Sequence, residues 1–207
     1  MKSRILLTGG SSGIGKSCHE LLKDQYLIDL PSRLEFDLTN LDHIDNWDYS
    51  VYDIVINCAG CNHGTYLGFQ DNTSLDQTQQ IQVNFIAPLL MIKNYTRSRQ
   101  SGQFIYISSS SIDNPFAYNV VNSTAKAALR YSIDVLQKEF KHIYFNEICP
   151  GKTKTNMLNQ NYKNTRSIED LELEYDRSPY LLPQEVAALV QQCIWNKKIS
   201  KINIQPQ

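Results

Sequence analysis

The sequence lacks any long hydrophobic run. Its first residues, MKSRILLTGG, reach a pair of glycines after three apolar residues, which is too short for the core of a signal peptide or for a membrane span. A charge bias is also missing, because 20 basic residues stand against 21 acidic ones and no cluster of Lys and Arg forms a stripe. These absences predict a cytoplasmic protein whose main partner is neither nucleic acid nor a membrane.

Cysteine is scarce and follows no disulfide framework. The five residues, an odd number, predict reduced thiols. One stretch, CAGC from Cys58 to Cys61, has the spacing of half a redox or zinc site. No second pair of cysteines or nearby pair of histidines completes it in the sequence. We therefore favour a tight turn of small residues there and predict no metal site.

What the chain does contain is an alternation of short apolar runs and helical patterns. Strands are predicted within the apolar runs at residues 4–10, which ends in glycines, 26–30, 35–39, 52–60, 103–108, 142–148 and 201–204. Helices are predicted at 14–25, 73–97, 117–140 and 183–195, with a helix or loop at 38–47. At 207 residues the chain suits a single domain, 1–207. The alternation predicts the α/β class, a Rossmann-like doubly wound parallel sheet flanked by helices.

The connection between the second and third predicted strands is unusually short. About four residues separate 26–30 from 35–39, whereas a parallel crossover needs roughly a dozen. Either the third strand is vestigial or the helix on that side has been deleted.

A glycine-rich turn, TGGSSGIG at residues 8–15, joins the first strand to the first helix. Gly9 allows a tight turn, while Gly13 and Gly15 let the backbone approach a pyrophosphate and the sheet. The helix N-terminus supplies unpaired N–H groups and the positive end of a dipole. This context predicts a nucleotide site; the alternative is a tight turn with only a structural role.

The spacing Thr-Gly-x3-Gly-x-Gly resembles the short-chain dehydrogenase/reductase family, and the resemblance extends along nearly all of the chain. Further matching motifs are NCAG at residues 57–60, VNFIAPL around Asn84, YISSS before Ser111 and CPGKTKT at 149–155. The resemblance implies an oxidoreductase that uses NAD or NADP on a hydroxyl or carbonyl group. The implied cofactor contacts are Thr8, Gly9, Ser11, Ser12, Gly13, Ile14, Gly15, Asp37, Leu38, Asn57, Ala59, Gly60, Lys126, Pro150, Gly151, Thr153 and Thr155.

The choice between the two cofactors stays open. An acidic residue after the second strand favours the ribose diol of NAD, and an arginine favours the phosphate of NADP. The stretch IDLPSR offers both, as Asp29 and Arg33, and either could also be a solvated loop charge.

The implied catalytic residues are Asn84, Ser109 and Lys126, but one member of the family's set is replaced. The family places its acid–base tyrosine four residues before the Lys and thirteen after the Ser, and both counts reach Asn122. An amide can donate a hydrogen bond but cannot give up a proton near neutral pH. Near Asn84, Pro88 removes a helical donor, which either frees a carbonyl for water or merely kinks the helix.

Several interpretations of Asn122 follow. Tyr118, one turn upstream, could replace the missing phenol; Ser109, Lys126 and water could support slow or different chemistry; or the domain could bind nucleotide without turnover, as a sensor or subunit. Asn122 could also be an introduced change in an active enzyme. We favour an oxidoreductase with impaired or altered catalysis, with the non-catalytic binding module as the alternative.

Two further features concern the substrate and assembly. The polar segment 156–180, with Tyr162, Tyr175 and Tyr180, is the expected substrate loop and suggests a small polar substrate.

The resemblance implies a homodimer or homotetramer that pairs two long helices. Their apolar residues suit such pairing and suit packing on the sheet equally well: Ile81, Phe85, Leu89 and Ile92 on one, Leu129, Ile133 and Leu136 on the other.

Overall fold

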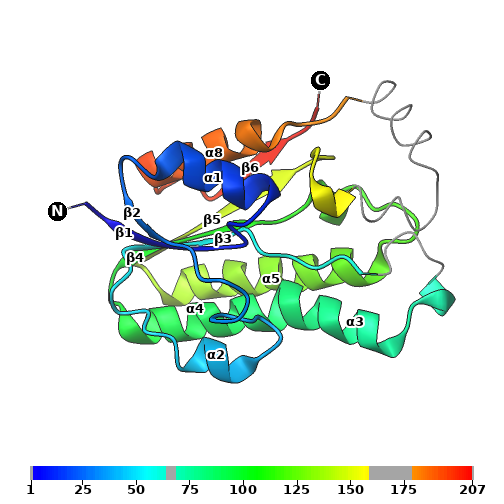
Figure 1. Ribbon diagram of the computed structural model, residues 1–207, viewed down its shortest axis with the longest axis horizontal. Helices are drawn as coiled ribbons and strands as arrows, with labels where there is room; N and C mark the ends of the chain where they lie inside the picture. Colours follow the sequence, from blue (N-terminus) through cyan, green and yellow to red (C-terminus); the bar gives the residue numbers. More distant parts are fainter. Residues whose placement is uncertain (1, 64–68, 159–178, 207) are drawn as a thin grey trace.

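A parallel β-sheet forms the centre of the protein, as seen in a computed structural model that describes residues 2–63, 69–158 and 179–206 (Figure 1). Its strands within these residues are β1 (Arg4–Thr8), β2 (Leu27–Asp29), β3 (Ile54–Asn57), β4 (Gly102–Ile107), β5 (Ile143–Pro150) and β6 (Lys201–Ile204). Their order across the sheet is β2-β1-β3-β4-β5-β6, and every neighbouring pair is parallel. The carboxyl ends of the strands therefore meet at one edge, where ligands bind in this architecture.

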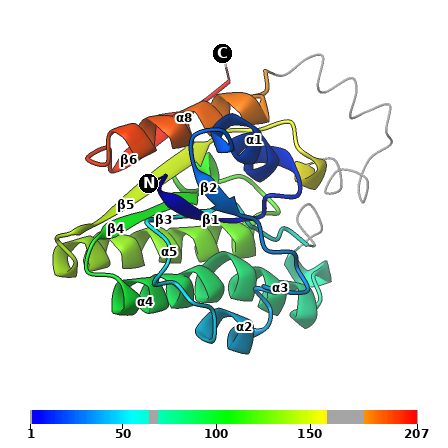
Figure 2. The ribbon, with the colours of Figure 1, turned by 60° about the vertical axis from the view of Figure 1, so that its left-hand side comes forward.

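Helices cover both faces of the sheet. They are α1 (Gly13–Leu22), α2 (Leu41–Asp45), α3 (Ser74–Ile81), α4 (Ala87–Ser98), α5 (Val120–Glu139) and α8 (Pro183–Trp195). Figures 1 and 2 show α1 and α8 side by side on one face and α2, α3, α4 and α5 on the other. The predicted doubly wound α/β class is thus confirmed. Of the helices within the described residues, none combines the length and hydropathy needed to cross a bilayer.

The core lies on both faces because the strand side chains alternate. On β1, Ile5 and Leu7 pack into the layer that contains α1 and α8, and Leu6 packs into the layer that contains α4 and α5. All three are fully buried. A strand buried on both faces has no polar side to display, which is why the sequence reads as a continuous apolar run there.

The predicted third strand at residues 35–39 does not form. Side chains bond the local backbone instead: Glu35 accepts from the Ser32 backbone N–H at 2.8 Å, and Asp37 accepts from Thr39 N–H at 2.8 Å. Such short-range bonds offer the chain an alternative to a sheet ladder. Phe36 still contributes to the core, so the apolar residues of this stretch serve packing without pairing.

The long helix predicted at residues 73–97 is interrupted. A π-helical turn, Gln82–Ile86, separates α3 from α4, and the backbone N–H of Ala87 donates to the Gln82 carbonyl. Pro88 follows directly in the first turn of α4. A proline cannot donate to the preceding turn, so the hydrogen-bond register changes beside it.

The apolar residues considered for helix pairing pack mainly on the sheet. Ile92, Leu129 and Ile133 are buried in the core, and Leu136 packs against it. Ile81, at the end of α3, is exposed. Oligomeric state is not tested by this packing and stays a prediction.

Candidate active site

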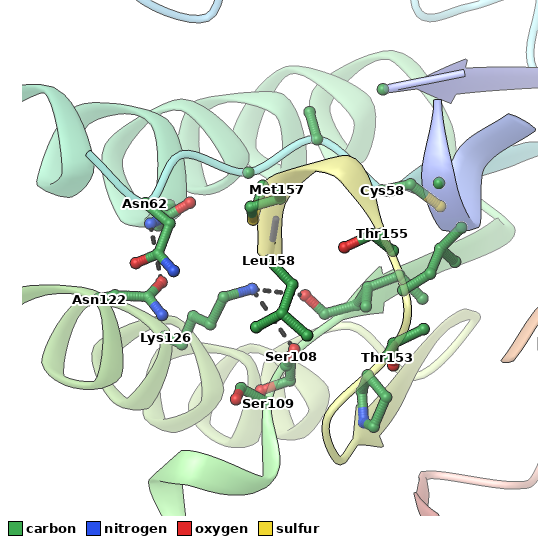
Figure 3. Close-up of a pocket in the computed structure, with 18 of the residues that line it drawn as sticks. Cys58, Asn62, Ser108, Ser109, Asn122, Lys126, Thr153, Thr155, Met157 and Leu158 are labelled. Carbon is green, nitrogen blue, oxygen red and sulfur yellow. Dashed lines mark hydrogen bonds between the residues drawn. The ribbon is translucent and has the colours of Figure 1, made fainter. Parts of the chain in front are cut away.

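A cavity of about 680 Å³ opens at the carboxyl edge of the sheet (Figure 3). It lies where β1, β3, β4 and β5 end, so residues distant in sequence share its wall. The described residues that line it include Gly9, Ser11, Ser12, Gly13, Ile14, Gly15, Cys58, Ala59, Gly60, Asn84, Ser109, Asn122, Lys126, Pro150, Gly151, Thr153 and Thr155. Most of the predicted site residues are therefore brought together.

The glycine turn provides a bare cradle at the start of α1. Gly9 has a φ of +70°, and a Cβ there would lie 2.6 Å from the backbone nitrogen of Ala59. Gly13, at φ +52°, would place a Cβ 3.1 Å from the Thr155 side chain. The N-cap residue Ser12 makes no side-chain capping bond, so the first N–H groups of α1 remain available to an anion.

Two of the predicted contact residues, Thr8 and Asn57, bond each other. The Thr8 hydroxyl donates to the Asn57 side-chain oxygen at 2.6 Å, and both side chains are buried. Neither lines the main cavity. This bond ties the end of β1 to the end of β3 beneath the turn and so fixes the positions of Gly9 and Ala59.

Three amide side chains form a hydrogen-bonded chain inside the cavity. Asn84, on the π-helical turn, donates to the Cys61 carbonyl at 2.6 Å and accepts from the Cys61 N–H at 2.9 Å. Its amide nitrogen also donates to the Asn122 oxygen at 3.1 Å. The Asn122 nitrogen donates in turn to the Asn119 oxygen at 3.2 Å. Asn122, only 7% exposed, is therefore held at both ends of its amide.

Hydroxyl groups continue this chain toward β4. The Asn119 nitrogen donates to the Ser123 oxygen at 2.7 Å, and Ser123 donates to Ser111 at 3.1 Å. The Ser111 and Ser109 hydroxyl oxygens lie 2.8 Å apart. The Ser111 hydroxyl thus orients the Ser109 side chain, and Ser109 lines the cavity.

Lys126 extends from α5 to the end of β4 (Figure 3). Its Nζ donates to the Ile107 carbonyl at 3.0 Å and to the Ser108 carbonyl at 3.4 Å. Among the described residues it forms no ion pair with a carboxylate. Burial lowers the pKa of Lys126 to about 8, so the group can change protonation state near neutral pH.

The comparisons with known proteins agree with this geometry. The family model for short chain dehydrogenase matches residues 45–166, more than half of the chain. The chain belongs to this short chain dehydrogenase family. An uncharacterized oxidoreductase of Bacillus subtilis (strain 168), YmfI, is 25% identical over 192 residues, covering 77% of this chain and 78% of the relative.

Solved structures of the short chain dehydrogenase type share the fold. A small-chain dehydrogenase in complex with NADPH has a TM-score of 0.86 at 22% identity, covering 99% of this chain and 97% of the other. A variant of actinorhodin polyketide ketoreductase with NADPH also has a TM-score of 0.86, at 18% identity, covering 99% and 96%. At these identities the likeness concerns the fold alone.

Within this short chain dehydrogenase fold, Tyr118 lies outside the main cavity. Its backbone has a φ of 67°, in the left-handed region, and α5 begins only at Val120 rather than at residue 117. The Tyr118 side chain is 57% exposed and lines a separate, smaller cavity. The structure therefore does not bring this phenol to Asn122 and Lys126.

The residues considered for the adenosine end are engaged elsewhere. Asp29 pairs with Arg4 at 2.8 Å and accepts from the Tyr52 hydroxyl at 2.7 Å. The largely exposed Arg33 lies 3.5 Å from Asp37. Neither these residues nor the buried Leu38 lines the main cavity.

The cysteine pair, Cys58 and Cys61, forms no disulfide. Cys58 and Cys61 are free thiols, and the described residues contain no group of three or more His, Cys, Asp or Glu that could hold a metal ion. The neighbouring thiol of Cys18 and burial raise the pKa of Cys58 well above its ordinary value. A protonated thiol is a weak metal ligand and a weak nucleophile.

Some lining residues were not predicted from the sequence. Phe116, Met157 and Leu158 add apolar surface, and Asn119 holds Asn122 in place. Figure 3 shows Met157 and Leu158 on the short segment that follows Thr155. Their only signal in the sequence was proximity to motifs. Of the predicted substrate loop, residues 159–178, including Tyr162 and Tyr175, lie outside the described residues.

An ion-pair network supports the serine loop from outside. Arg130 on α5 bonds Glu147 at 2.7 Å and Asp113 at 2.6 Å, and it also donates to the Cys149 sulfur at 3.1 Å. Lys201 on β6 reaches Asp113 at 3.1 Å. Hydrogen bonds from Arg130 and then Lys201 lower the pKa of Asp113. The loop that follows Ser109 is thereby tied to α5, β5 and β6.

Proposed function

We propose that this NAD(P)-dependent oxidoreductase interconverts a carbonyl and a hydroxyl group on a small polar molecule, with a proton transfer altered by Asn122. The observation that carries the proposal is the content of one cavity: a buried amide, a serine hydroxyl and the Lys126 ammonium surround the space beside the glycine turn. No tyrosine lines the described part of this cavity. The machinery for binding is present, and the usual proton donor of the family is replaced.

The residues present fit a dinucleotide. A Cβ would fill the cradle at Gly9 and Gly13, and the uncapped N-terminus of α1 suits the two negative charges of a pyrophosphate. Ser11, Ser12 and Ile14 would contact the phosphates; Lys126, Thr153 and Pro150 would hold the nicotinamide end. When bound, the nicotinamide supplies or accepts a hydride. The geometry favours neither NAD nor NADP, because Asp29 and Arg33 already pair with other side chains.

Lys126 is the remaining acid next to the serine. The ionisable residues that line the described cavity are Cys58, Cys61, Lys126 and Lys152. The neighbouring Cys18 thiol, with burial, raises the pKa of Cys58, and burial raises the pKa of Cys61, whereas burial lowers the pKa of Lys126 to about 8. Reduction of a carbonyl would leave an alkoxide that takes its proton from Lys126 or from water, while Ser109 and Asn122 orient the oxygen by hydrogen bonds.

The absence of a phenol beside Lys126 in the described part of the cavity should lower the turnover rate. General acid–base catalysis by a well-matched group contributes roughly 10²–10⁴-fold. Without the phenol we expect turnover reduced by about this factor relative to an enzyme that retains it. A non-catalytic sensor or subunit is the alternative, and it is favoured by the bonds that hold the Asn122 and Asn84 amides to other protein groups.

The test begins with binding. Purified protein is titrated with NADH and NADPH while nicotinamide fluorescence is recorded, and a panel of ketones, aldehydes and sugars is then assayed for turnover. Saturable binding with turnover that Lys126→Ala abolishes would support the oxidoreductase, with circular dichroism checking that the variant folds. Tight binding without turnover would favour the non-catalytic alternative, and failure of both cofactors to bind would refute the nucleotide site.

The proposal extends to the location and the oligomeric state of the protein. The free thiols favour a reducing, cytoplasmic location. The family resemblance favours a homodimer or homotetramer, which light scattering of the purified protein would test.

A further inference from the structure

A second cavity of about 210 Å³ lies beyond the wall of the main one. The described residues that line it are Phe69, Asn72, Gln80, Tyr118, Asn119, Val120 and Val121. They come from the short turn before α3, from α3 itself and from the start of α5. The buried Asn119 lines both cavities, so the two spaces adjoin at this residue.

Gln80, one of the residues that line this second cavity, carries a hydrogen-bond acceptor without a partner. The side chain is only 2% exposed, and its nitrogen donates to the His63 carbonyl. Its oxygen is buried and has no hydrogen-bond partner in the described structure. Buried polar atoms are nearly always paired, so an orphaned acceptor in a cavity wall points to a donor that arrives from outside.

The rest of the lining is largely apolar and open to solvent. Phe69 and Val120 are both exposed, and Tyr118 adds a phenol ring. The volume is below the roughly 300 Å³ at which pockets begin to enclose a whole ligand. The space therefore suits one substituent of a molecule, with an apolar body and a hydroxyl or N–H group at its end.

We infer that this second cavity is a subsite for the part of the substrate remote from the reacting carbon. As a substrate subsite it rests on the proposed function, because the reacting group would lie beside Asn122 in the main cavity. Asn119, which bonds Asn122 and lines both spaces, lies between the two parts. The preferred substrate class is then a carbonyl compound or alcohol whose distal apolar substituent ends in a hydrogen-bond donor, and Gln80 selects for that donor.

The first experiment measures binding without catalysis. The side-chain amide signal of Gln80 is followed by ¹H–¹⁵N NMR, with its assignment given by its loss in Gln80→Met. Benzyl alcohol serves as the probe with a donor and benzyl methyl ether as the probe without one. We expect a saturable shift with benzyl alcohol and an affinity roughly three- to tenfold lower for the ether. Equal affinities, or shifts that do not saturate, would overturn the inference.

A second variant guards against misfolding of Gln80→Met. Val121→Phe fills the cavity from α5, and Val135→Phe, at an exposed position of the same helix, is the matched control. With the spectra otherwise preserved, benzyl alcohol should lose its effect in Val121→Phe and keep it in Val135→Phe. Binding that persists in Val121→Phe would place the probe elsewhere and refute the subsite.

The titrations with NADH and NADPH separate this inference from the proposed function. Benzyl alcohol that binds at Gln80 in a protein that binds neither cofactor would refute the proposed function and, with it, the substrate role of the cavity. Cofactor binding without any effect of benzyl alcohol on Gln80 would refute the subsite and leave the oxidoreductase in place. With both present, the donor-bearing probe should also compete with whichever ketone is turned over.

Discussion

Asn122→Tyr is the substitution that tests the altered proton transfer most directly. The change removes the amide that accepts from Asn84 at 3.1 Å and donates to Asn119 at 3.2 Å. Each neutral hydrogen bond contributes about 0.5–1.5 kcal/mol, so the variant should lose about 1–3 kcal/mol of unfolding free energy. Asn84 keeps both of its bonds to the Cys61 backbone, which limits the rearrangement.

Although Asn122→Tyr should lower the stability of the protein, it should raise the rate of carbonyl reduction. A phenol at position 122 projects from α5 four residues before Lys126, whose ammonium would lower the phenol's pKa. We expect kcat/KM for carbonyl reduction to rise by roughly 10²–10⁴-fold. The assay follows the loss of nicotinamide absorbance with a panel of ketones, and urea denaturation gives the stability cost.

A matched variant isolates the hydroxyl group. Asn122→Phe removes the same hydrogen bonds to Asn84 and Asn119. It adds a ring of nearly the same size as that of tyrosine but without the hydroxyl group. It should lose similar stability and gain no activity. A Phe variant as fast as the Tyr variant, or a Tyr variant that binds cofactor and remains as slow as the wild type, would refute the assignment of position 122 to proton transfer.

Three other predictions follow from the site and its supports. Gly9→Ala should lower the free energy of unfolding by at least about 1–2 kcal/mol, because φ is +70° there, and should weaken cofactor binding in the fluorescence titration. Lys126→Met should stabilise the protein at pH 7 by up to about 3 kcal/mol, because the folded pKa of about 8 lies below the unfolded value of 10.5. The free energy of unfolding of the wild type, relative to that of the variant, should therefore rise as the pH goes from about 8 to 10.5. Urea denaturation at several pH values measures this difference, and a difference that does not change with pH would contradict the prediction. Arg130→Ala should cost about 3–5 kcal/mol because it leaves Glu147 buried without its partner, whereas Lys201→Ala, at a more exposed pair, should cost less than about 1 kcal/mol by the same measurement.

The sequence predicted those elements whose cause is local or periodic. The helix at 183–195 was predicted with the bounds that the structure has, because it begins with a proline. The first strand, Arg4–Thr8, lies within the apolar run predicted at 4–10 and ends before its glycines. The prediction of a strand at 35–39 was wrong, because Glu35 and Asp37 accept hydrogen bonds from nearby backbone N–H groups, and these bonds compete with pairing to a neighbouring strand. The start of α5 was placed three residues early, since a left-handed conformation at Tyr118 leaves no trace in hydrophobic periodicity.

The site was predictable where a motif required a backbone shape, and less so where side chains choose partners. The glycine turn was predicted from its spacing and Lys126 and Asn84 from the family resemblance, and all three line the cavity. Asp29 was also found by position, but its pairing with Arg4 depends on the neighbouring strand. Likewise, the bond between Asn119 and Asn122 depends on where α5 begins, which the pattern did not give.

The network around Arg130 has a consequence for the order in which the molecule opens. Asp113 lies in the loop that follows Ser109, whereas Lys201 belongs to β6, 88 residues later. Because Arg130 and Lys201 hold the same carboxylate, opening of the loop and of that edge of the sheet should be coupled by less than about 1 kcal/mol. Native-state hydrogen exchange would then show a small fall in the opening free energies of both the 110–114 amides and the β6 amides when Asp113 is neutralised.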